Sequence, residues 1–230
     1  MNISVAMATY NGEKFIKEQI ESILEDLERD DEIVISDDGS DDDSISIIYS
    51  IMNVDSRVHF VKGPGKGVVK NFENALKNCQ NDIICFSDQD DIWLHGKREK
   101  IVSCFADEKV ELITHNGQFV NEKGEPLEKT PWVKMKHGVF RNLIKSCYFV
   151  CCMSFRRNCL DFLLPFPTNL NAYDQYIGAK FEKRKTSFFI NDVLIKHRIH
   201  GNNCTRHLSL FEKIRFRIVL LSCYLYEDNQ

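Results

Sequence analysis

The sequence predicts an α/β protein whose central sheet is mixed but mostly parallel and is flanked by helices. Short apolar runs alternate with segments of helical periodicity through the first 116 residues, the pattern of parallel strands joined by crossover helices. After residue 116 the alternation becomes irregular, and turn signals there predict one or two antiparallel strands. The chain has 230 residues, 43% of them hydrophobic, which suits one domain with a full core.

The elements of the first half follow from their apolar patterns and from the polar residues that stop them. The segment 13–27 carries an apolar stripe at helical spacing, formed by Phe15, Ile16, Ile20, Ile23, Leu24 and Leu27. The acidic run Asp41-Asp42-Asp43 suits the first turn of a helix, where the macrodipole favours negative charge. In order, we expect strands at 3–8, 32–36, 58–61, 83–86 and 111–114, and helices at 13–27, 41–51, 68–78 and 96–106.

The second half is predicted to be less regular. Asn191-Asp192 separates two apolar runs and is a turn signal, so it predicts a hairpin. No linker or internal repeat divides the chain. In order, we expect a turn at 121–124, a strand at 149–155, a helix at 173–183, and hairpin strands at 187–190 and 193–199.

The C-terminal residues 208–226 are predicted to form an amphipathic helix, with apolar positions interleaved by Lys213, Arg215 and Arg217. Two uses of this helix remain open. It could pack on the body of the protein or on a partner subunit as a homodimer, or it could lie in the interface of a membrane. No apolar stretch reaches the roughly 20 residues of a membrane span.

Charge and cysteine content exclude several classes of protein. The net charge of -4 and pI near 6.0 argue against a nucleic-acid binder held mainly by phosphate contacts. The start of the chain has no basic segment before its apolar run, so no secretory signal is expected. Nine cysteines occur without a C-x-x-C pair, which indicates free thiols in a reducing cytoplasm. A peripheral position on the inner face of the membrane stays open.

Polar clusters follow each of the first four predicted strands. Ligands of open α/β sheets bind outside the carboxyl ends of the strands, so these clusters should meet at one rim. The carboxylates after the fourth strand would repel one another unless a cation neutralised them, and a divalent metal with a phosphate ligand would do so. A solvated acidic loop is the alternative. The clusters are Thr9-Tyr10-Asn11, Asp37-Asp38, Gly63-Pro64-Gly65-Lys66-Gly67 and Asp88-Gln89-Asp90.

In order and spacing, four segments resemble the successive motifs of family 2 glycosyltransferases: Thr9-Tyr10-Asn11-Gly12, Asp37-Asp38-Gly39-Ser40, Gly67-Val68-Val69-Lys70-Asn71 and Asp88-Gln89-Asp90-Asp91-Ile92-Trp93. The last segment, with Ser87 before it, further resembles bacterial members that build surface polysaccharides, including rhamnosyltransferases. The resemblance implies the GT-A fold over residues 1–205, with a nucleotide-binding half at 1–116 and an acceptor-binding half at 117–205. It leaves 206–230 as the C-terminal helical segment.

The resemblance also implies which residues bind the nucleotide. Tyr10 would stack on or flank the base, and Thr9 would line the same pocket. Asp38 would accept a hydrogen bond from the N3–H group of uracil or thymine, whereas Asp37 is expected to be a structural cap. Lys70 matches a basic position near the nucleotide, with a solvated helix lysine as the alternative.

A metal site and a catalytic base complete the expectation. In the D-x-D motif, Asp90 would bind Mg²⁺ or Mn²⁺ beside the diphosphate, and Asp88 would reach the ribose or a water bound to the metal, which places it in the metal set with Asp90 and His200. His200, in a segment similar to the family's Y-R-x-H-x-x-N, would approach the metal or the diphosphate; His197 replaces the usual Tyr there. Asp91 is expected to accept hydrogen bonds from the following turn, although a role as third ligand stays open.

Asp174 is the expected base. It lies in Tyr173-Asp174-Gln175-Tyr176, at the position where the family places an Asp at the start of a helix facing the acceptor. The alternative is that Asp174 merely complements its own helix dipole. We expect its pKa to lie well below neutrality in the metal-bearing site, or at least not far above neutrality, which would leave it available as a base at pH 7.

The predicted activity is therefore metal-dependent, inverting transfer of a sugar from dTDP-rhamnose or a UDP-hexose. The acceptor would be a hydroxyl of a glycan or of a lipid-linked glycan in surface polysaccharide synthesis. Two other classes remain open. A nucleotidyltransferase uses a similar sheet, but the loop at 9–12 lacks the glycine-rich, basic sequence of that class. The third class is a module that binds nucleotide sugars without catalysis.

Overall fold

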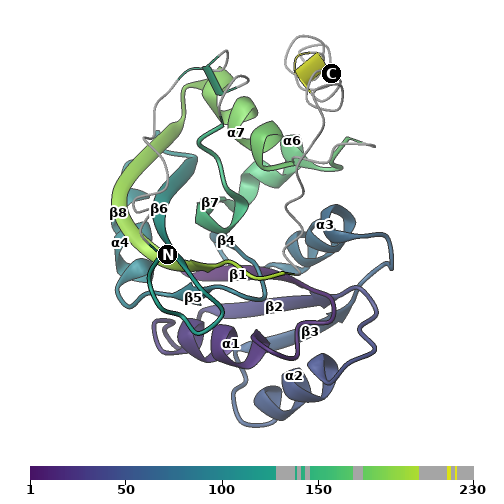
Figure 1. The fold of residues 1–230 in the computed structure, drawn as a ribbon. Helices are drawn as coiled ribbons and strands as arrows, with labels where there is room; N and C mark the ends of the chain where they lie inside the picture. The colour runs from purple at the N-terminus through teal and green to yellow at the C-terminus, as the bar shows by residue number, and fades with distance from the viewer. Residues whose placement is uncertain are drawn as a thin grey trace.

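One eight-stranded sheet forms the centre of the part of the chain that the structure describes (Figure 1). This structure is a computed structural model of residues 1–230, and it describes residues 1–127, 138, 141–142, 146–167, 173–201, 217–218 and 221. The strands lie in the order β3-β2-β1-β4-β7-β6-β8-β5, so the α/β architecture with a mostly parallel, mixed sheet is confirmed.

The strands and helices have the following bounds. The strands are β1 (Ile3–Thr9), β2 (Glu32–Asp37), β3 (Val58–Lys62), β4 (Ile83–Ser87), β5 (Ile92–Trp93), β6 (Leu112–Val120), β7 (Met153–Arg156) and β8 (Ser187–Arg198). The α-helices are α1 (Ile16–Leu24), α2 (Ser44–Met52), α3 (Val68–Asn78), α4 (Lys97–Cys104), α6 (Leu160–Leu163) and α7 (Tyr173–Arg184). Two 3₁₀ turns are η1 (Val150–Cys152) and η2 (Arg157–Cys159).

The first half of the chain forms the parallel part of the sheet. β1 pairs in parallel with β2 on one side and with β4 on the other, and β2 pairs in parallel with β3. The chain therefore changes direction across the sheet between β1 and β4, which is the position where open α/β sheets bind ligands. The carboxyl ends of β1, β2 and β4 meet at the same edge, as the sequence predicts.

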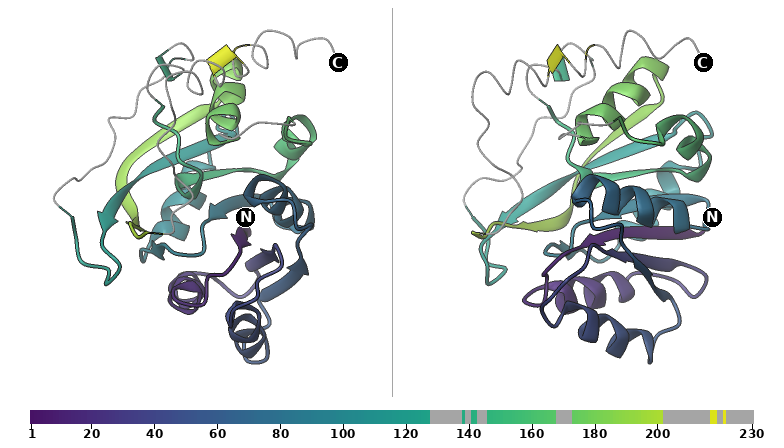
Figure 2. Two further views of the ribbon diagram at one scale, coloured as in Figure 1. Left: turned by 45° about the vertical axis from the view of Figure 1, so that its right-hand side comes forward. Right: turned by 90° about the vertical axis from the view of Figure 1, so that its right-hand side faces the viewer.

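Two strands run antiparallel to the others: β7, from the second half of the chain, and the short strand β5, from the first half. β7 runs antiparallel to both of its neighbours, β4 and β6, and joins the later part of the chain to the parallel sheet. β5 pairs antiparallel with β8 at the far edge. The sequence does not predict β5, because its two residues belong to the acidic motif that follows β4. In Figure 2 the N-terminal half lies below and the later half above, joined by the continuous sheet.

The hairpin predicted around Asn191-Asp192 is wrong, because β8 is one continuous strand. Its first part pairs with β6 as far as Phe189, and its second part resumes pairing at Val193, with a register shift near Asn116. The residues between form a bulge, held by a hydrogen bond of 3.2 Å from Asn116 Nδ2 to Asn191 O. A long partner strand thus turns a local turn signal into a bulge.

The strand predicted at 149–155 is also partly wrong. Its first part is the 3₁₀ turn η1, closed by a hydrogen bond of 3.0 Å from Cys152 N to Phe149 O. Only the part from Met153 onwards is strand, and it extends to Arg156. An apolar run predicts burial for a turn as well as for a strand, and the η1 residues are indeed buried.

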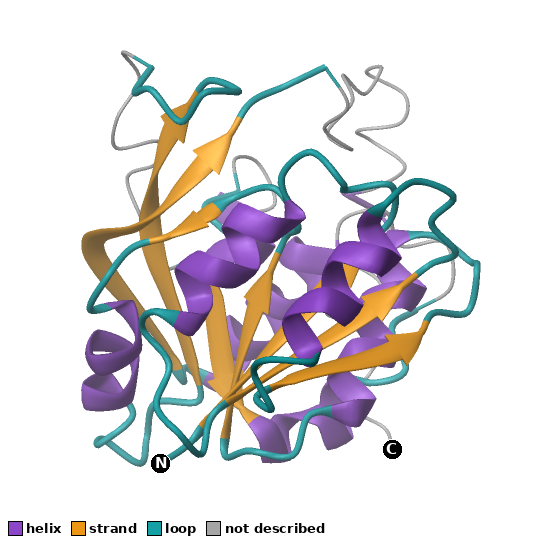
Figure 3. Cartoon of the chain, turned by 90° about the horizontal axis from the view of Figure 1, so that it is seen from below, coloured by secondary structure: helices purple, strands orange, loops and turns teal. Residues whose placement is uncertain are grey.

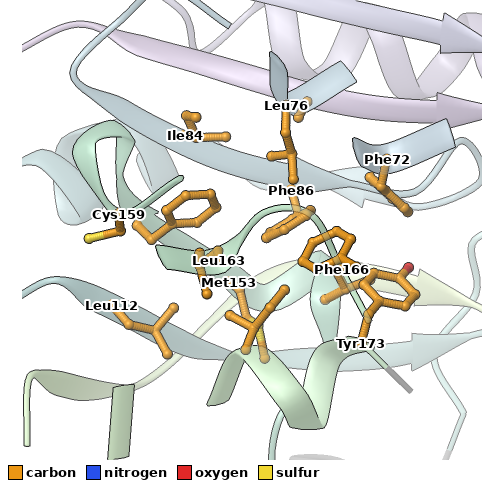
Figure 4. Close-up of a cluster of buried hydrophobic side chains, with 14 of the residues drawn as sticks. Phe72, Leu76, Ile84, Phe86, Leu112, Met153, Cys159, Leu163, Phe166 and Tyr173 are labelled. Atoms are coloured by element: carbon orange, nitrogen blue, oxygen red, sulfur yellow. The ribbon is translucent and has the colours of Figure 1, made fainter. Parts of the chain in front are cut away.

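Side chains of the sheet alternate between two hydrophobic clusters, one on each face. Ile84 and Phe86 point to the cluster that packs against α3, α6 and α7 (Figure 4). Ala6 belongs to the same cluster. Val5 and Ile83 point to the cluster that packs against α1, α2 and α4. Figure 3 shows helices in front of and behind the fan of strands. The core therefore fixes both faces of the sheet and leaves its carboxyl edge for polar residues.

The expected C-terminal helix at 206–230 lies almost wholly outside the described residues. Among the helices that are described, none is both long enough and apolar enough to pass through a lipid bilayer.

Candidate functional site

Gln89 joins the end of β1 to the end of β4. Its Oε1 atom accepts hydrogen bonds from Thr9 Oγ1 at 2.6 Å and from Tyr10 N at 2.9 Å, and its Nε2 atom donates to Tyr10 O at 3.1 Å. A side-chain carbon added at Gly12 would come within 2.4 Å of Gln89 Oε1. Thr9 is buried, whereas 56% of Tyr10 is exposed, so the loop presents an aromatic ring on a fixed backbone.

The two carboxylates after β2 both accept hydrogen bonds from the backbone. Asp37 accepts from Gly39 N at 3.0 Å and Ser40 N at 2.8 Å, which makes it the structural cap that the sequence predicts. Asp38 accepts from Gly65 N at 2.7 Å and Gly67 N at 2.6 Å, so it holds the loop that leads into α3.

Asn71 anchors the start of α3 to the same rim. Its Nδ2 atom donates to Thr9 O at 3.0 Å and to Ser36 O at 2.8 Å, and Asn71 is only 2% exposed. Lys70, one residue earlier, forms an ion pair of 2.6 Å with Glu73. Lys70 therefore lies at the start of α3 with its ammonium against its own helix. The sequence assigns no role to Asn71, although the residue belongs to a recognised motif.

Three carboxylates crowd the end of β4. Asp90 is 9% exposed and Asp91 is 1% exposed, while Asp88 is half-buried. His200 Nε2 lies 2.7 Å from Asp90 Oδ2, so the segment just after β8 reaches the second aspartate of the D-x-D motif. His197 Nδ1 lies 2.7 Å from Asp91 Oδ1. Asp91 thus contacts β8 and not the following turn, which corrects that expectation.

Arg198 binds the backbone of the acidic segment at 88–91. The residue is 2% exposed, and its guanidinium donates to Asp90 O at 3.0 Å and to Glu122 O at 2.6 Å and pairs with Glu18 at 2.7 Å. The rings of Phe15 and His200 lie 4.9 Å apart, and the Arg198 guanidinium lies 4.7 Å from the same Phe15 ring. Arg198 and His200 therefore share one face, as their alternation predicts.

The electrostatics of this cluster favour a bound cation. Burial, followed by the charges of Asp91 and Asp90, raises the pKa of Asp88 to about 8. Burial and the neighbouring Asp91 also raise the pKa of Asp90. Asp91 Oδ2 is buried and has no hydrogen-bond partner among the described residues. Buried, mutually repelling acids, one of which keeps an unpartnered oxygen, are chemically suited to a divalent cation. Of the three residues expected to bind it, Asp90 and His200 contact each other.

Asp174 lies in the first turn of α7, as predicted, and is half-buried. Its Oδ1 atom accepts a hydrogen bond of 2.7 Å from Gln175 N, and burial raises its pKa to about 6. The preceding ring, Tyr173, lies 5.6 Å from Phe72 of α3, and Phe72 lies 5.5 Å from Phe86 of β4 (Figure 4). These contacts bring the start of α7 towards the rim that carries the acidic motif.

The structure gathers most of the predicted site residues at one edge. Asp90 and His200 touch directly, and Asp38 is joined to Thr9 by a hydrogen bond of 2.9 Å from Asp38 N to Thr9 O. The sequence does not reveal the roles of Gln89, or of Cys151, whose thiol lies 3.9 Å from His197 Nδ1.

Comparison with known proteins agrees with this geometry. The sequence model described as glycosyl transferase family 2 matches residues 4–163. The dTDP-rhamnosyl transferase RfbG of Shigella flexneri is 41% identical over 110 residues, which cover 44% of this chain and 37% of the relative. The Escherichia coli enzyme named UDP-Glc:alpha-D-GlcNAc-diphosphoundecaprenol beta-1,3-glucosyltransferase WfgD is 26% identical over 150 residues, which cover 65% of this chain and 57% of the relative. The chain thus spans less than two thirds of either relative.

Solved structures share the fold. S. aureus TarS in complex with UDP-GlcNAc has a TM-score of 0.73 at 21% identity, covering 96% of this chain and 67% of that one. The mannosyltransferase PcManGT from Pyrobaculum calidifontis, in complex with GDP-Man and Mn²⁺, has a TM-score of 0.66 at 19% identity, covering 87% and 57%. The expected GT-A fold is confirmed. Because the family model covers well over half of its residues, the chain belongs to glycosyl transferase family 2.

Proposed function

We propose that this chain transfers a sugar, with inversion, from a nucleotide-diphosphate sugar to a hydroxyl of a glycan or lipid-linked glycan in surface polysaccharide synthesis. The observation that carries the proposal is the contact of 2.7 Å between Asp90 and His200, within a cluster of crowded acids at the switch point of the sheet. Such a cluster is unfavourable by itself and becomes favourable around a cation that holds a diphosphate.

Asp88, Asp90 and His200 are the proposed ligands of Mg²⁺ or Mn²⁺. When bound, that cation would neutralise the charge that develops on the nucleoside diphosphate leaving group. Arg198 fixes the Asp90 backbone, which keeps this carboxylate at the rim. The Mn²⁺ in the PcManGT complex supports a divalent ion for this fold.

The nucleotide would lie over the ends of β1 and β2. Thr9 and Tyr10 would line its base, and Tyr10 is exposed there on a backbone fixed by Gln89. Asp38 would read the N3–H group of uracil or thymine, and a carboxylate has about four acceptor sites, of which the loop amides use three. Lys70 would lie near the diphosphate. The name of RfbG supports dTDP-rhamnose as donor, and that of WfgD supports UDP-glucose.

Asp174 is the proposed base. It takes the proton of the acceptor hydroxyl while the oxygen of that hydroxyl bonds to the anomeric carbon. The bond from this carbon to the diphosphate oxygen breaks on the opposite side, which inverts the configuration. A pKa of about 6 suits the role, because the carboxylate is mostly ionised at neutral pH and is still basic.

The proposal divides the chain into a nucleotide-binding half at 1–116, an acceptor-binding half at 117–205, and a C-terminal segment at 206–230. A lipid-linked acceptor would explain a peripheral position on the inner face of the membrane, to which the C-terminal helix would contribute. The alternative is that this helix forms a homodimer contact. Sedimentation distinguishes the membrane contact from the homodimer contact. The full chain and a chain ending at residue 205 are each measured with and without vesicles of anionic lipid.

One experiment tests the transferase. The full chain is incubated with Mn²⁺ or Mg²⁺ and with dTDP-rhamnose, UDP-glucose, UDP-GlcNAc or GDP-mannose, and nucleotide release and thermal shift are measured. We expect a metal-dependent shift and nucleotide release with a dTDP- or UDP-sugar and neither with GDP-mannose. A shift that needs no metal, or one confined to the GDP-sugar, contradicts the proposal.

Two other functions are separated by further assays. A nucleotidyltransferase would form nucleotide sugar and pyrophosphate from a nucleoside triphosphate and a sugar phosphate. A binding module would show tight UDP binding by calorimetry without nucleotide release under any condition.

A further inference from the structure

A second group of potential metal ligands lies next to the Asp90–His200 contact. Asp88, Asp91, Cys151 and His197 each offer one donor atom, and these atoms all lie within 4.8 Å of one another. The donors come from three separate parts of the fold: the end of β4, the turn η1 and the end of β8. Neither Asp90 nor His200 belongs to this group.

Asp91 provides an independent sign that this group accommodates a ligand. Its side chain is 1% exposed, and its Oδ1 atom is used by His197 Nδ1 at 2.7 Å and by Arg198 N at 3.2 Å. Its Oδ2 atom has no hydrogen-bond partner among the described residues. A buried carboxylate oxygen without a partner is costly, and Asp91 offers one of its two carboxylate oxygens to the group.

The charge around the group can be balanced by a divalent ion. Two carboxylates and a thiolate would carry three negative charges. Lys97, which is 1% exposed, places its ammonium 3.5 Å from Cys151 O and 3.8 Å from the centre of the Trp93 ring. A divalent ion together with this buried ammonium neutralises the set, which a monovalent ion would not do.

The chemical types of the four ligand atoms indicate which metal would bind. A thiolate, an imidazole and carboxylates are the ligands of zinc, which binds four such groups tetrahedrally. Mg²⁺ and Ca²⁺ prefer oxygen ligands alone, so a sulfur donor disfavours them. Cys151 therefore distinguishes this group chemically from the oxygen and imidazole ligands of Asp90 and His200.

We propose that Asp88, Asp91, Cys151 and His197 form a second cation site, which binds a zinc-type transition metal and ties η1 and β8 to the end of β4. The proton of the Cys151 thiol, and the proton of the His197 nitrogen that becomes the ligand, are released to solvent when the metal binds. Asp88 also belongs to the proposed donor-metal set, so it would lie between the two ions. The second site is inferred from these contacts alone, so the inference does not depend on whether the protein transfers a sugar.

Cobalt spectroscopy tests the site without any activity measurement. The full chain is freed of metal with a chelator and titrated with Co²⁺, whose bond to a thiolate gives a charge-transfer band in the near ultraviolet. We expect one saturable band, which is displaced by Zn²⁺ but not by excess Mg²⁺. The Cys151→Ala variant should lose the band, while Cys152→Ala, which changes the adjacent buried cysteine, should keep it.

Two further variants locate the metal. Asp90→Asn should keep the band, because Asp90 is not in the group, whereas His197→Gln should weaken Co²⁺ binding about tenfold or more. Zn²⁺ should raise the melting temperature of the wild type and of Cys152→Ala but not that of His197→Gln, a comparison that holds even if Cys151→Ala fails to fold. Absence of a thiolate band in the wild type overturns the proposal, as does a band that survives in Cys151→Ala or disappears in Asp90→Asn.

Discussion

The two sides of the candidate site use aspartates in opposite ways. On the side of β1 and β2, Asp37 and Asp38 accept hydrogen bonds from backbone N–H groups. On the side of β4 and β8, Asp88 and Asp91 lie against other acids and histidines, and Asp91 keeps an unpartnered oxygen. In the first arrangement backbone N–H groups satisfy the carboxylates, whereas in the second the proposed cations would do so. The side of β1 and β2, called the base side because the proposed nucleobase would lie there, is therefore preformed. The side of β4 and β8, called the metal side after the proposed cations, is where binding would stabilise the fold.

The largest effect is expected from a substitution on the metal side. Asp90→Asn should lower sugar transfer by about 10²–10³-fold, because it weakens the charge stabilisation of the leaving group. Nucleotide release at saturating donor and metal measures this loss. Asp37→Asn is the matched control on the base side, and it should lower the melting temperature while transfer keeps its dependence on Mn²⁺. Equal transfer by Asp90→Asn and wild type would contradict the assignment.

Asp174 should have the next largest effect. Asp174→Asn should lower the transfer rate by about 10²–10⁴-fold, because a general base contributes about that much. Its pKa is raised to about 6 by burial, so it loses its basic form as the pH falls. The wild-type rate at saturating substrate should decrease as pH drops through about 6 and stay level above 7. Thermal shift with UDP should be unchanged in Asp174→Asn, and a variant whose rate matches the wild type would exclude Asp174 as the base.

A double-mutant cycle tests the connection between the two sides. Gln89→Ala removes the hydrogen bonds to Thr9 and Tyr10, which should lower the free energy of unfolding by about 1–2 kcal/mol and raise the donor KM. Gly12→Ala should have a similar effect, since its new methyl group would displace the same Gln89 amide. The double mutant should therefore be little worse than either single mutant.

Denaturant unfolding of the four proteins measures this coupling. Additive losses in the double mutant would show that Gly12 and Gln89 act on stability separately, and the connection would then not depend on the Gln89 amide.

The contrast between the two sides also explains what the sequence could reveal. Strand ends followed by acids are local patterns, and α3 occupies the predicted residues 68–78. The contact of Asp91 with His197 joins residues 106 positions apart, and no local pattern encodes it. The mistaken hairpin at Asn191-Asp192 has the same cause, because the partner strand β6 lies far away in the sequence.

The role of Gln89 illustrates this limit within a recognised motif. The resemblance marks its two neighbours as ligands, yet the hydrogen bonds of Gln89 to Thr9 become visible only when β1 and β4 are paired. The types of residue at the rim could therefore be predicted from the sequence, whereas their partners could not.

Asp38 offers a smaller effect that separates two roles. Asp38 holds the loop at 63–67. Asp38→Asn should therefore lower the free energy of unfolding by about 1 kcal/mol, because the amide offers one acceptor oxygen instead of two. As a reader of the base, Asp38→Asn should also reduce the preference for UDP over GDP. Calorimetry with the two nucleotides measures that preference, and an unchanged ratio would limit Asp38 to the loop.

Lys70 should show the smallest effect, and Lys77 provides its matched control. Both ammonium groups pair with Glu73, at 2.6 Å and 2.7 Å, so Lys70→Ala and Lys77→Ala should each lower the free energy of unfolding by a few tenths of a kcal/mol, about the value of an exposed ion pair. Lys70 lies in the first turn of α3, near the rim, whereas Lys77 lies in the last turn. If Lys70 also contacts the diphosphate, loss of that contact should raise the donor KM by about two- to fivefold in Lys70→Ala only. If steady-state kinetics give the same donor KM for both variants, Lys70 serves Glu73 alone, and the base side meets the nucleotide without a cationic side chain from α3.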